Sequence, residues 1–267
     1  MLKKYGQHFL SDPEILGRIV DTLAPGPGDT VLEVGPGRGS LTDILVARAG
    51  RVIAVEIDHI LSQQLREKYA SHPNVEIIEG DVLETDIAAV AGAEFLVIGN
   101  VPYYITTPIV FKTLEPPIPR RSVFLVQREV AERMTSRAGE ESYGALTVNV
   151  AAVARAEIVM SVPRSAFKPP PKVDSSVVRL TPRPKPLIDA AYLKGFRTFV
   201  QACFGLRRKQ IQRVVRTVSG LSPSDATTLL DRLEIDSAAR PEVLTPETFV
   251  RLFSELRRSI PAVAEGE

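Results

Sequence analysis

Short apolar runs alternate with amphipathic stretches along the first half of the chain. Five runs rich in β-branched residues predict strands at residues 30–34, 51–55, 75–78, 95–98 and 123–126. Apolar residues spaced three or four apart predict helices around these strands, at residues 12–23, 41–49, 60–70 and 108–114. Strands that alternate with helices are typical of a parallel sheet covered by helices. The pattern therefore predicts an α/β fold with a doubly wound parallel sheet.

The pattern changes in the second half of the chain. Two helices and then two strands, which a long loop joins as a hairpin, are predicted at residues 129–137, 143–154, 159–162 and 175–180. The proline-punctuated stretch 181–186 reads as a linker. Beyond it only helices are predicted, at residues 190–204, 207–218, 223–233 and 246–257. We therefore expect two domains, residues 1–183 with the sheet and residues 187–262 with a small all-helical bundle.

Composition narrows the class of protein. The 267 residues are 44% apolar and 24% charged, as in an ordinary soluble globular protein. No apolar run approaches the ~20 residues of a membrane span, and the first residues lack the apolar segment of a secretory signal. The single cysteine, Cys203, fits a reducing compartment, and with three histidines it makes no metal-ligand cluster. We expect a cytoplasmic protein with no metal and no membrane partner.

The net charge of +1 hides an uneven distribution. Residues 164–216 contain 13 Lys or Arg and 2 Asp or Glu, a local balance of +11, while the remainder carries −10. A basic block on an otherwise acidic protein predicts a surface that binds phosphate. Lys209, Arg213 and Arg216 fall on one face of the predicted helix 207–218, and Arg207 and Arg208 begin it. We expect these five cations to bind RNA; the alternative is a solvated helix face.

Acidic and glycine residues follow three successive predicted strands. Glu33 begins the run Glu-Val-Gly35-Pro-Gly37-Arg-Gly, whose glycines allow a sharp turn and the close approach of a ligand. Glu56 ends the second strand and could accept both hydroxyls of a ribose; the alternative is an exposed acid before a helix. Asp81 and Val82 end the third strand, where Asp81 could accept from an adenine amine or simply cap a turn.

These strand ends converge on one crevice, which fits a cofactor that bears adenosine. NAD and S-adenosylmethionine are the two alternatives. A pyrophosphate favours helix N-terminal amides without acids close by, whereas Glu33 lies beside the loop and suits a cationic amino acid end. We therefore expect S-adenosylmethionine as the cofactor.

The fourth strand ends in Asn100-Val-Pro102-Tyr103. An amide oxygen and a free backbone carbonyl can accept both hydrogens of an exocyclic amine, while a tyrosine stacks on the ring that carries it. This set suits chemistry at N6 of adenine. The alternative is a plain turn, because Asn and Pro are ordinary turn residues.

Together with these groups, several motifs resemble the bacterial small-subunit (16S) rRNA adenine N6,N6-dimethyltransferase family over residues 3 to 258. The matching segments are Gly6-Gln7-His8-Phe9-Leu10, the loop 33–39, Gly80-Asp81-Val82, Gly99–Tyr103, Phe167–Ser175, Phe196-Arg197 and Phe204–Lys209. His8 and Tyr104 stand where many relatives carry Asn. The resemblance implies a Rossmann-like class I methyltransferase domain followed by a small all-helical domain. It also implies dimethylation of two adjacent adenosines in a hairpin near the 3′ end of the RNA.

The resemblance also implies which residues hold the cofactor. They are Gln7, His8, Leu10, Glu33, Gly35, Gly37, Glu56, Asp81, Val82 and Asn100. For His8 the alternative is that it only packs beside the loop. The implied partner is small-subunit rRNA within the precursor of the 30S subunit, bound by a monomer.

The N6 amine of adenine is a poor nucleophile because its lone pair is delocalised into the ring. Hydrogen bonds from both N–H groups to the Asn100 side-chain oxygen and to the carbonyl of Val101 or Pro102 would pull the nitrogen toward sp³ geometry. Tyr103 would stack on the base, and Phe167 would supply a second face unless it only fills the core. A large-subunit rRNA methylase, a DNA adenine methylase and a non-enzymatic ribosome-assembly factor are the competing functions.

Overall fold

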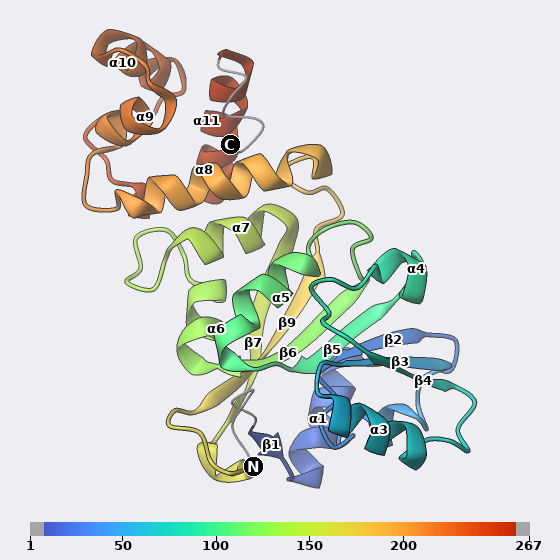
Figure 1. The fold of residues 1–267 in the computed structure, drawn as a ribbon. Helices are drawn as coiled ribbons and strands as arrows, with labels where there is room; N and C mark the ends of the chain where they lie inside the picture. The colour runs from blue at the N-terminus through green and yellow to red at the C-terminus, as the bar shows by residue number, and fades with distance from the viewer. Residues whose placement is uncertain (1–7, 260–267) are drawn as a thin grey trace. The chain divides into compact units, whose positions relative to one another are not determined.

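The computed structural model describes residues 8–259, and the expectation for Gln7 lies outside this range. The described residues form two compact units, shown in Figure 1. Unit 1 falls in Met1–Ala131 and Arg155–Pro182, and unit 2 in Glu132–Ala154 and Arg183–Glu267. We describe each unit by itself.

Unit 1 is built on a seven-stranded sheet of order β4-β3-β2-β5-β6-β9-β7. Its strands are β2 (Thr30–Val34), β3 (Arg51–Glu56), β4 (Val75–Glu79), β5 (Leu96–Asn100), β6 (Arg121–Gln127), β7 (Ala154–Val162) and β9 (Ser175–Pro182). Strands β2 to β6 are parallel, and β9 pairs antiparallel with β6. Every residue from Val52 to Glu56 is buried, as expected for a central parallel strand covered on both faces.

Helix α1 (Pro13–Leu23) shows how local sequence sets these elements. Asp12 caps its N-terminus by accepting from the amides of Glu14 and Ile15, and Pro13 occupies the first helical position. Its apolar face packs against β5, β6 and β9. The other helices of unit 1 are α2 (Thr42–Leu45), α3 (His59–Lys68), α4 (Ile87–Ala91) and α5 (Thr106–Lys112), and α6 (Arg128–Thr135) leads out of it.

The parallel strands and the hairpin confirm the predicted α/β architecture, but several elements differ. Helix α2 is shorter than the predicted 41–49, and strand β7 begins at Ala154, where a helix was expected. A two-stranded sheet of β1 (Phe9–Leu10) and β8 (Phe167–Lys168) was not predicted. Strands of two residues carry no local periodicity, so only their long-range pairing defines them.

Unit 2 is helical. It contains α7 (Ala145–Val153), α8 (Leu193–Gly205), α9 (Ile211–Ser219), α10 (Pro223–Arg232) and α11 (Pro246–Ser259). Its core includes Phe196, Phe199 and Phe253, whose rings pack edge-to-face or tilted at centroid distances of 5.5 and 5.6 Å. The buried Tyr143 donates to the Leu244 carbonyl at 2.6 Å.

The compact units do not follow the chain as simply as the two expected domains, 1–183 and 187–262. The linker indeed contains the boundary at Pro182, but residues 132–154 belong to unit 2. The reason is packing, because α7 lies against α8 and α11 and seven of its nine residues are buried. A helix that is buried on nearly all sides has no polar face in its sequence that would indicate how it packs.

Candidate active site

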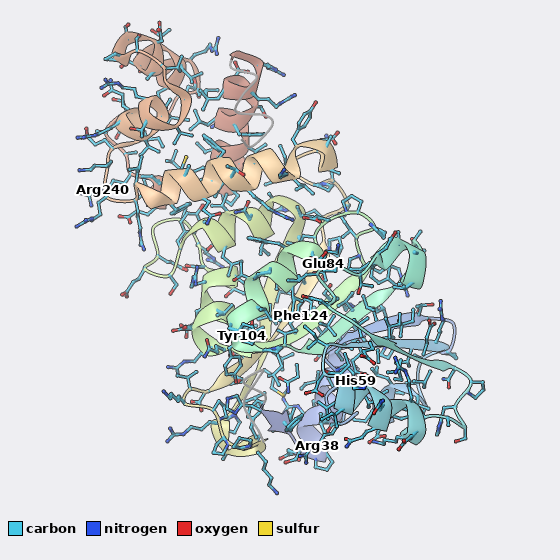
Figure 2. All side chains as sticks on the ribbon, in the orientation of Figure 1. Arg38, His59, Glu84, Tyr104, Phe124 and Arg240 are labelled. Atoms are coloured by element: carbon cyan, nitrogen blue, oxygen red, sulfur yellow. The ribbon has the colours of Figure 1, made fainter. Side chains whose placement is uncertain are left out.

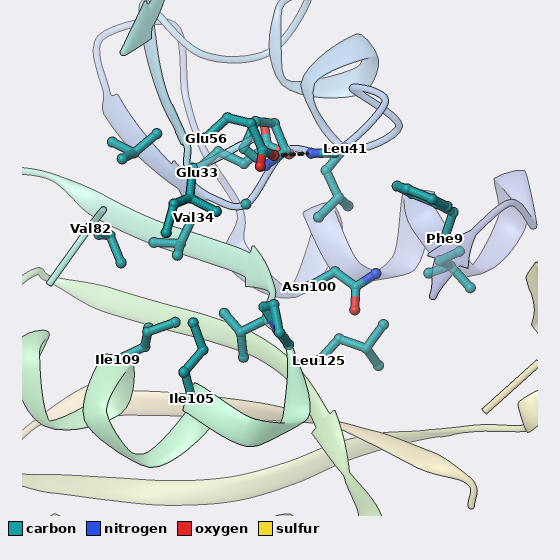
Figure 3. A pocket seen from close by; sticks show the side chains of 18 of the residues that line it. Phe9, Glu33, Val34, Leu41, Glu56, Val82, Asn100, Ile105, Ile109 and Leu125 are labelled. Carbon is teal, nitrogen blue, oxygen red and sulfur yellow. Dashed lines mark hydrogen bonds between the residues drawn. The ribbon is translucent and has the colours of Figure 1, made fainter. Parts of the chain in front are cut away.

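A pocket opens at the carboxyl ends of β2, β3 and β5, where ligands bind in open α/β sheets. Figure 3 shows the carboxylates of Glu33 and Glu56 together on one side of the pocket, with Ile105, which precedes α5, and Ile109 of α5 on another. All lining residues belong to unit 1. The pocket therefore joins an acidic end to an apolar wall within one compact unit.

The glycine-rich loop forms the wall next to the acids. Gly35 and Gly37 have φ values of +66° and +60°, which side chains rarely tolerate. A Cβ on Gly37 would also lie 3.0 Å from the Phe9 ring. The Gly37 amide donates to Oε2 of Glu56 at 2.9 Å. The loop is thus held by the carboxylate that follows the neighbouring strand.

Glu56 is 2% exposed and uses both oxygens, because Oε1 accepts from the Asp58 amide at 3.0 Å. Burial raises the pKa of this carboxyl, while the amides of Asp58 and Gly37 act to lower it. A carboxylate offers about four acceptor sites, and two remain for ribose hydroxyls. Glu56 was expected to bind the cofactor. Its hydrogen bond to the Gly37 amide of the loop is an additional role that the spacing in the sequence does not reveal.

Glu33 is fully buried beneath the loop and accepts from Thr42 Oγ1 at 2.6 Å. Burial raises its pKa to about 7, against the lowering effect of the Thr42 hydrogen bond. A group with this pKa changes charge near neutral pH, and a cationic ligand would favour the ionised form. This site fits the amino end of an amino acid cofactor.

Asp81 lies in the pocket lining, and so does Val82. Oδ1 of Asp81 accepts from the Leu83 amide at 2.9 Å, so the side chain does cap the following turn. Its second oxygen has no protein partner among the hydrogen bonds of the described residues. The structure thus shows the turn cap, and the contact between Asp81 and an adenine amine stays a prediction for the second oxygen.

Asn100 and the N-terminal segment are joined. Nδ2 of Asn100 donates to the His8 carbonyl at 3.1 Å, which turns the amide oxygen the other way (Figure 3). His8 donates from Nδ1 to the Pro169 carbonyl at 2.8 Å, and its ring stacks on Tyr103 with centroids 5.8 Å apart. The amide is thus oriented with its acceptor available.

The backbone carbonyls of Val101 and Pro102 differ in whether they already accept hydrogen bonds. The Pro102 carbonyl accepts from the Ile105 amide at 3.1 Å and from Thr106 Oγ1 at 3.2 Å, so both of its lone pairs are used. The Val101 carbonyl accepts no hydrogen bond from any described residue. Of the two predicted backbone acceptors, the geometry favours Val101.

Tyr103 is half-buried, and its hydroxyl hydrogen-bonds Oγ of the buried Ser175 at 2.8 Å. Burial raises the pKa of the Tyr103 phenol, and the Ser175 bond partly offsets this. Ser175 ends the motif 167–175, which was singled out for the resemblance without a role for this residue. The hydrogen bond restrains the hydroxyl end of the Tyr103 side chain.

Phe167 does not join the pocket. It is 2% exposed, pairs with Leu10 in the β1–β8 sheet and belongs to the hydrophobic core. The expectation that it stacks on the base is wrong for this structure, and the alternative of core filling holds. Its role is indirect, because the β1–β8 pair holds Leu10 and Phe9 against the pocket.

The expected RNA-binding cations lie in unit 2. Arg208, Lys209, Arg213 and Arg216 are exposed, whereas Arg207 pairs with Glu242 at 2.6 Å and donates to the Glu141 carbonyl. Lys209 does not share the helical face with Arg213, because the extended backbone of Gln210 caps α9. The four exposed cations therefore comprise two on α9 and two that precede it.

Two further findings concern the described residues only. Between residues 8 and 259 no group of three or more His, Cys, Asp or Glu side chains is arranged to hold a metal ion. None of the helices in that range has the length and apolar character to cross a membrane.

The fold and the pocket define a class I S-adenosylmethionine-dependent methyltransferase. The glycine loop, the free acceptor sites of Glu56 and Asp81 and the buried Glu33 fit the ribose, adenine and amino acid parts of that cofactor. Residues 1–258 match the model of the family described as ribosomal RNA adenine dimethylase, and the chain belongs to this family.

Individual relatives agree with the family. The chain is 40% identical to the ribosomal RNA small subunit methyltransferase A of Bacillus cytotoxicus, over 95% of this chain and 90% of the relative. The protein of the same name from Shouchella clausii is also 40% identical, over 96% of this chain and 91% of the relative. A dimethyladenosine transferase from Plasmodium falciparum has a similar structure, with a TM-score of 0.81, 28% identity and 95% and 99% coverage. The structure of the 23S rRNA methyltransferase ErmE is also similar, with a TM-score of 0.71 and 34% sequence identity, over 93% of this chain and 99% of that chain.

Proposed function

We propose that this protein dimethylates N6 of two adjacent adenosines in a hairpin near the 3′ end of small-subunit rRNA during ribosome biogenesis. The single observation that carries the chemistry is the pair of acceptors beside Tyr103. The Asn100 amide is oriented by the His8 carbonyl, and the Val101 carbonyl is free. The choice of the small subunit rests on the names of the curated relatives.

The cofactor supplies a methyl group on an already activated sulfonium, so the residues of the chain have to align the nucleophile. Asn100 and the Val101 carbonyl accept the two N6 hydrogens and favour a lone pair that points out of the ring plane. Tyr103 stacks on the adenine, with a gain of about 1–3 kcal/mol per base that is comparable to the cost of flipping. No general base is required, because the proton leaves after methyl transfer.

We propose that Gly35, Gly37, Glu33, Glu56, Asp81, Val82, His8, Leu10 and Asn100 hold the cofactor. The support is that all nine line the one pocket. We further propose that the 30S precursor is bound by a monomer in the cytoplasm, and that the helical domain, predicted as 187–262, carries Arg208, Lys209, Arg213 and Arg216 to the RNA. Arg207 is removed from this set because Glu242 occupies it.

Methylation of large-subunit rRNA is the second candidate, favoured by the similarity to the 23S rRNA methyltransferase. One experiment separates the two. Labelled S-adenosylmethionine is incubated with the protein and with small or large subunits from a strain that lacks the modification, and nucleosides are mapped by mass spectrometry. We expect N6,N6-dimethyladenosine in small-subunit RNA alone. Label in the large subunit supports the second candidate, and RNA binding without label supports an assembly factor.

A further inference from the structure

Tyr104 is an aromatic residue of the pocket with no place in the chemistry above. The residue is 62% exposed (labelled in Figure 2), and it lines the pocket together with its chain neighbour Tyr103. Among residues 8–259 it is the sole aromatic side chain of the large exposed hydrophobic set. The structure gives it no hydrogen bond and no ring contact within that range. Because Tyr104 is both exposed and part of the pocket lining, its ring is available to stack on a ligand that extends beyond Tyr103.

The backbone presents this ring rigidly. Tyr103, Tyr104 and Ile105 form a single 3₁₀ turn, closed by the hydrogen bond from the Ile105 amide to the Pro102 carbonyl at 3.1 Å. Because a 3₁₀ helix has about three residues per turn, the side chains of neighbouring residues diverge. Tyr103 accordingly turns inward to Ser175, and Tyr104 faces solvent. A tyrosine on a fixed turn loses little conformational freedom when it stacks.

In the proposed substrate, the nucleotide next to the target adenosine is a candidate for stacking on the Tyr104 ring. When one of two adjacent adenosines leaves its stack for Tyr103, the next nucleotide loses a stacking neighbour. The Cα atoms of Tyr103 and Tyr104 are about 3.8 Å apart, as in any trans peptide, so the two rings can serve successive nucleotides. Stacking on an aromatic side chain replaces what the neighbour loses.

We propose that Tyr104 stacks on the nucleotide next to the target adenosine and so contributes to the recognition of the adenosine pair. This inference rests on the proposed function. The Tyr104 ring makes no contact with the reacting atoms, and it acts on the capture of RNA. A purine neighbour, with its larger ring system, gains more from it than a pyrimidine.

The test is a double-mutant cycle between protein and RNA. Small subunits are reconstituted with rRNA whose 3′ hairpin is ligated from synthetic RNA, carrying either adenosine or an abasic nucleotide beside the target. On the adenosine pair, Tyr104→Ala should raise KM about tenfold with kcat nearly unchanged, the size of one lost stacking contact. Tyr104→Phe should restore the wild-type KM. On the abasic RNA, Tyr104→Ala should change KM less than about twofold, because the partner of the ring is already gone.

Ile158→Ala is the matched control, since it removes another exposed hydrophobic side chain of unit 1 outside the pocket lining. The proposal is overturned if Tyr104→Ala raises KM equally on both RNAs. It is also overturned if Tyr104→Phe does not keep the wild-type KM. A loss of S-adenosylhomocysteine affinity in Tyr104→Ala also overturns it, because the ring then serves the cofactor. If the wild type methylates no small-subunit RNA, the proposed function fails, whereas methylation without coupling refutes only the role of Tyr104.

Discussion

The pocket of unit 1 and the basic surface of unit 2 use charge in opposite ways. In the pocket, Glu33 and Glu56 are buried, and each accepts a hydrogen bond from a neighbouring group of the protein. On unit 2, Arg213 and Arg216 are exposed. Buried groups act through geometry, so one lost contact has a large effect, whereas exposed cations act additively through the field they create. The comparison teaches that burial, more than the presence of a charge, decides how sensitive an ionisable residue is to substitution.

Asn100→Ala should give the largest effect. It removes the oriented acceptor, and by analogy with the loss of one positioned hydrogen-bonding group we expect kcat to fall about 10²- to 10³-fold. Single-turnover methyl transfer measures the rate. The affinity for RNA serves as the control and should be close to wild type. The affinity for S-adenosylhomocysteine and the thermal midpoint are measured as well, because the substitution also removes a proposed cofactor contact and the hydrogen bond to the His8 carbonyl. A rate within threefold of wild type would remove Asn100 from the mechanism.

Glu33→Gln tests whether a buried acid limits stability. The pKa of Glu33 is raised from 4.5 to about 7 by burial, so between these values the folded protein binds more protons than the unfolded chain. Stability therefore falls as pH rises from about 4.5 to 7, by on the order of 3 kcal/mol at 1.36 kcal/mol per pKa unit. The glutamine stays neutral and still accepts from Thr42. Urea unfolding at pH 5 and pH 8 should show a smaller loss in Glu33→Gln than in wild type; equal losses would contradict the prediction.

Glu56→Gln should weaken cofactor binding by roughly five- to 100-fold. An amide has one acceptor oxygen, so either the Gly37 or the Asp58 amide loses its partner, a loss of about 1–3 kcal/mol when buried. Calorimetric titration with S-adenosylhomocysteine measures the affinity. Glu76→Gln is the matched control, because Glu76 lies on β4 at the surface, paired with Arg51. Unchanged affinity in Glu56→Gln would show that the loop is held without this carboxylate.

These predictions depend on contacts that the sequence indicates to different degrees. The ends of β2, β3 and β5 were predictable because β-branched runs stop at glycine, acid or amide residues, and parallel strands place such ends at one edge. The link from Gly37 to Glu56 was not, since it joins residues 19 apart through a side chain. Phe167 was misplaced for the same reason. Its partner Leu10 lies more than 150 positions away, and two-residue strands leave no local pattern.

Helix packing and helix boundaries are hardest to predict from local sequence where a helix lacks distinct polar and apolar faces, or where a capping residue sets its end. Helix α7 has no polar face, so its packing in unit 2 could not be read from its spacing. Lys209 has the right interval to Arg213, but Gln210 takes an extended conformation and begins α9 after it. Propensity and spacing describe helix interiors well, whereas helix ends are set by the cap.

The exposed cations should give the smallest single effects, and Arg207 and Arg213 sharpen the comparison because their substitution removes the same charge. Arg213→Ala should weaken RNA binding modestly and reduce the slope of log affinity against log salt by about 1. Arg207→Ala should leave that slope unchanged, because Glu242 already neutralises the guanidinium. It should instead lower the thermal midpoint, since the hydrogen bonds to Glu242 and the Glu141 carbonyl are lost. Filter binding between 50 and 200 mM salt and thermal unfolding of both variants measure the two effects. If Arg207→Ala lowers the salt slope as Arg213→Ala does, the ion pair between Arg207 and Glu242 opens when RNA binds. RNA affinity would then depend on the total charge of the basic residues and not on which of them lack an acidic partner in the free protein.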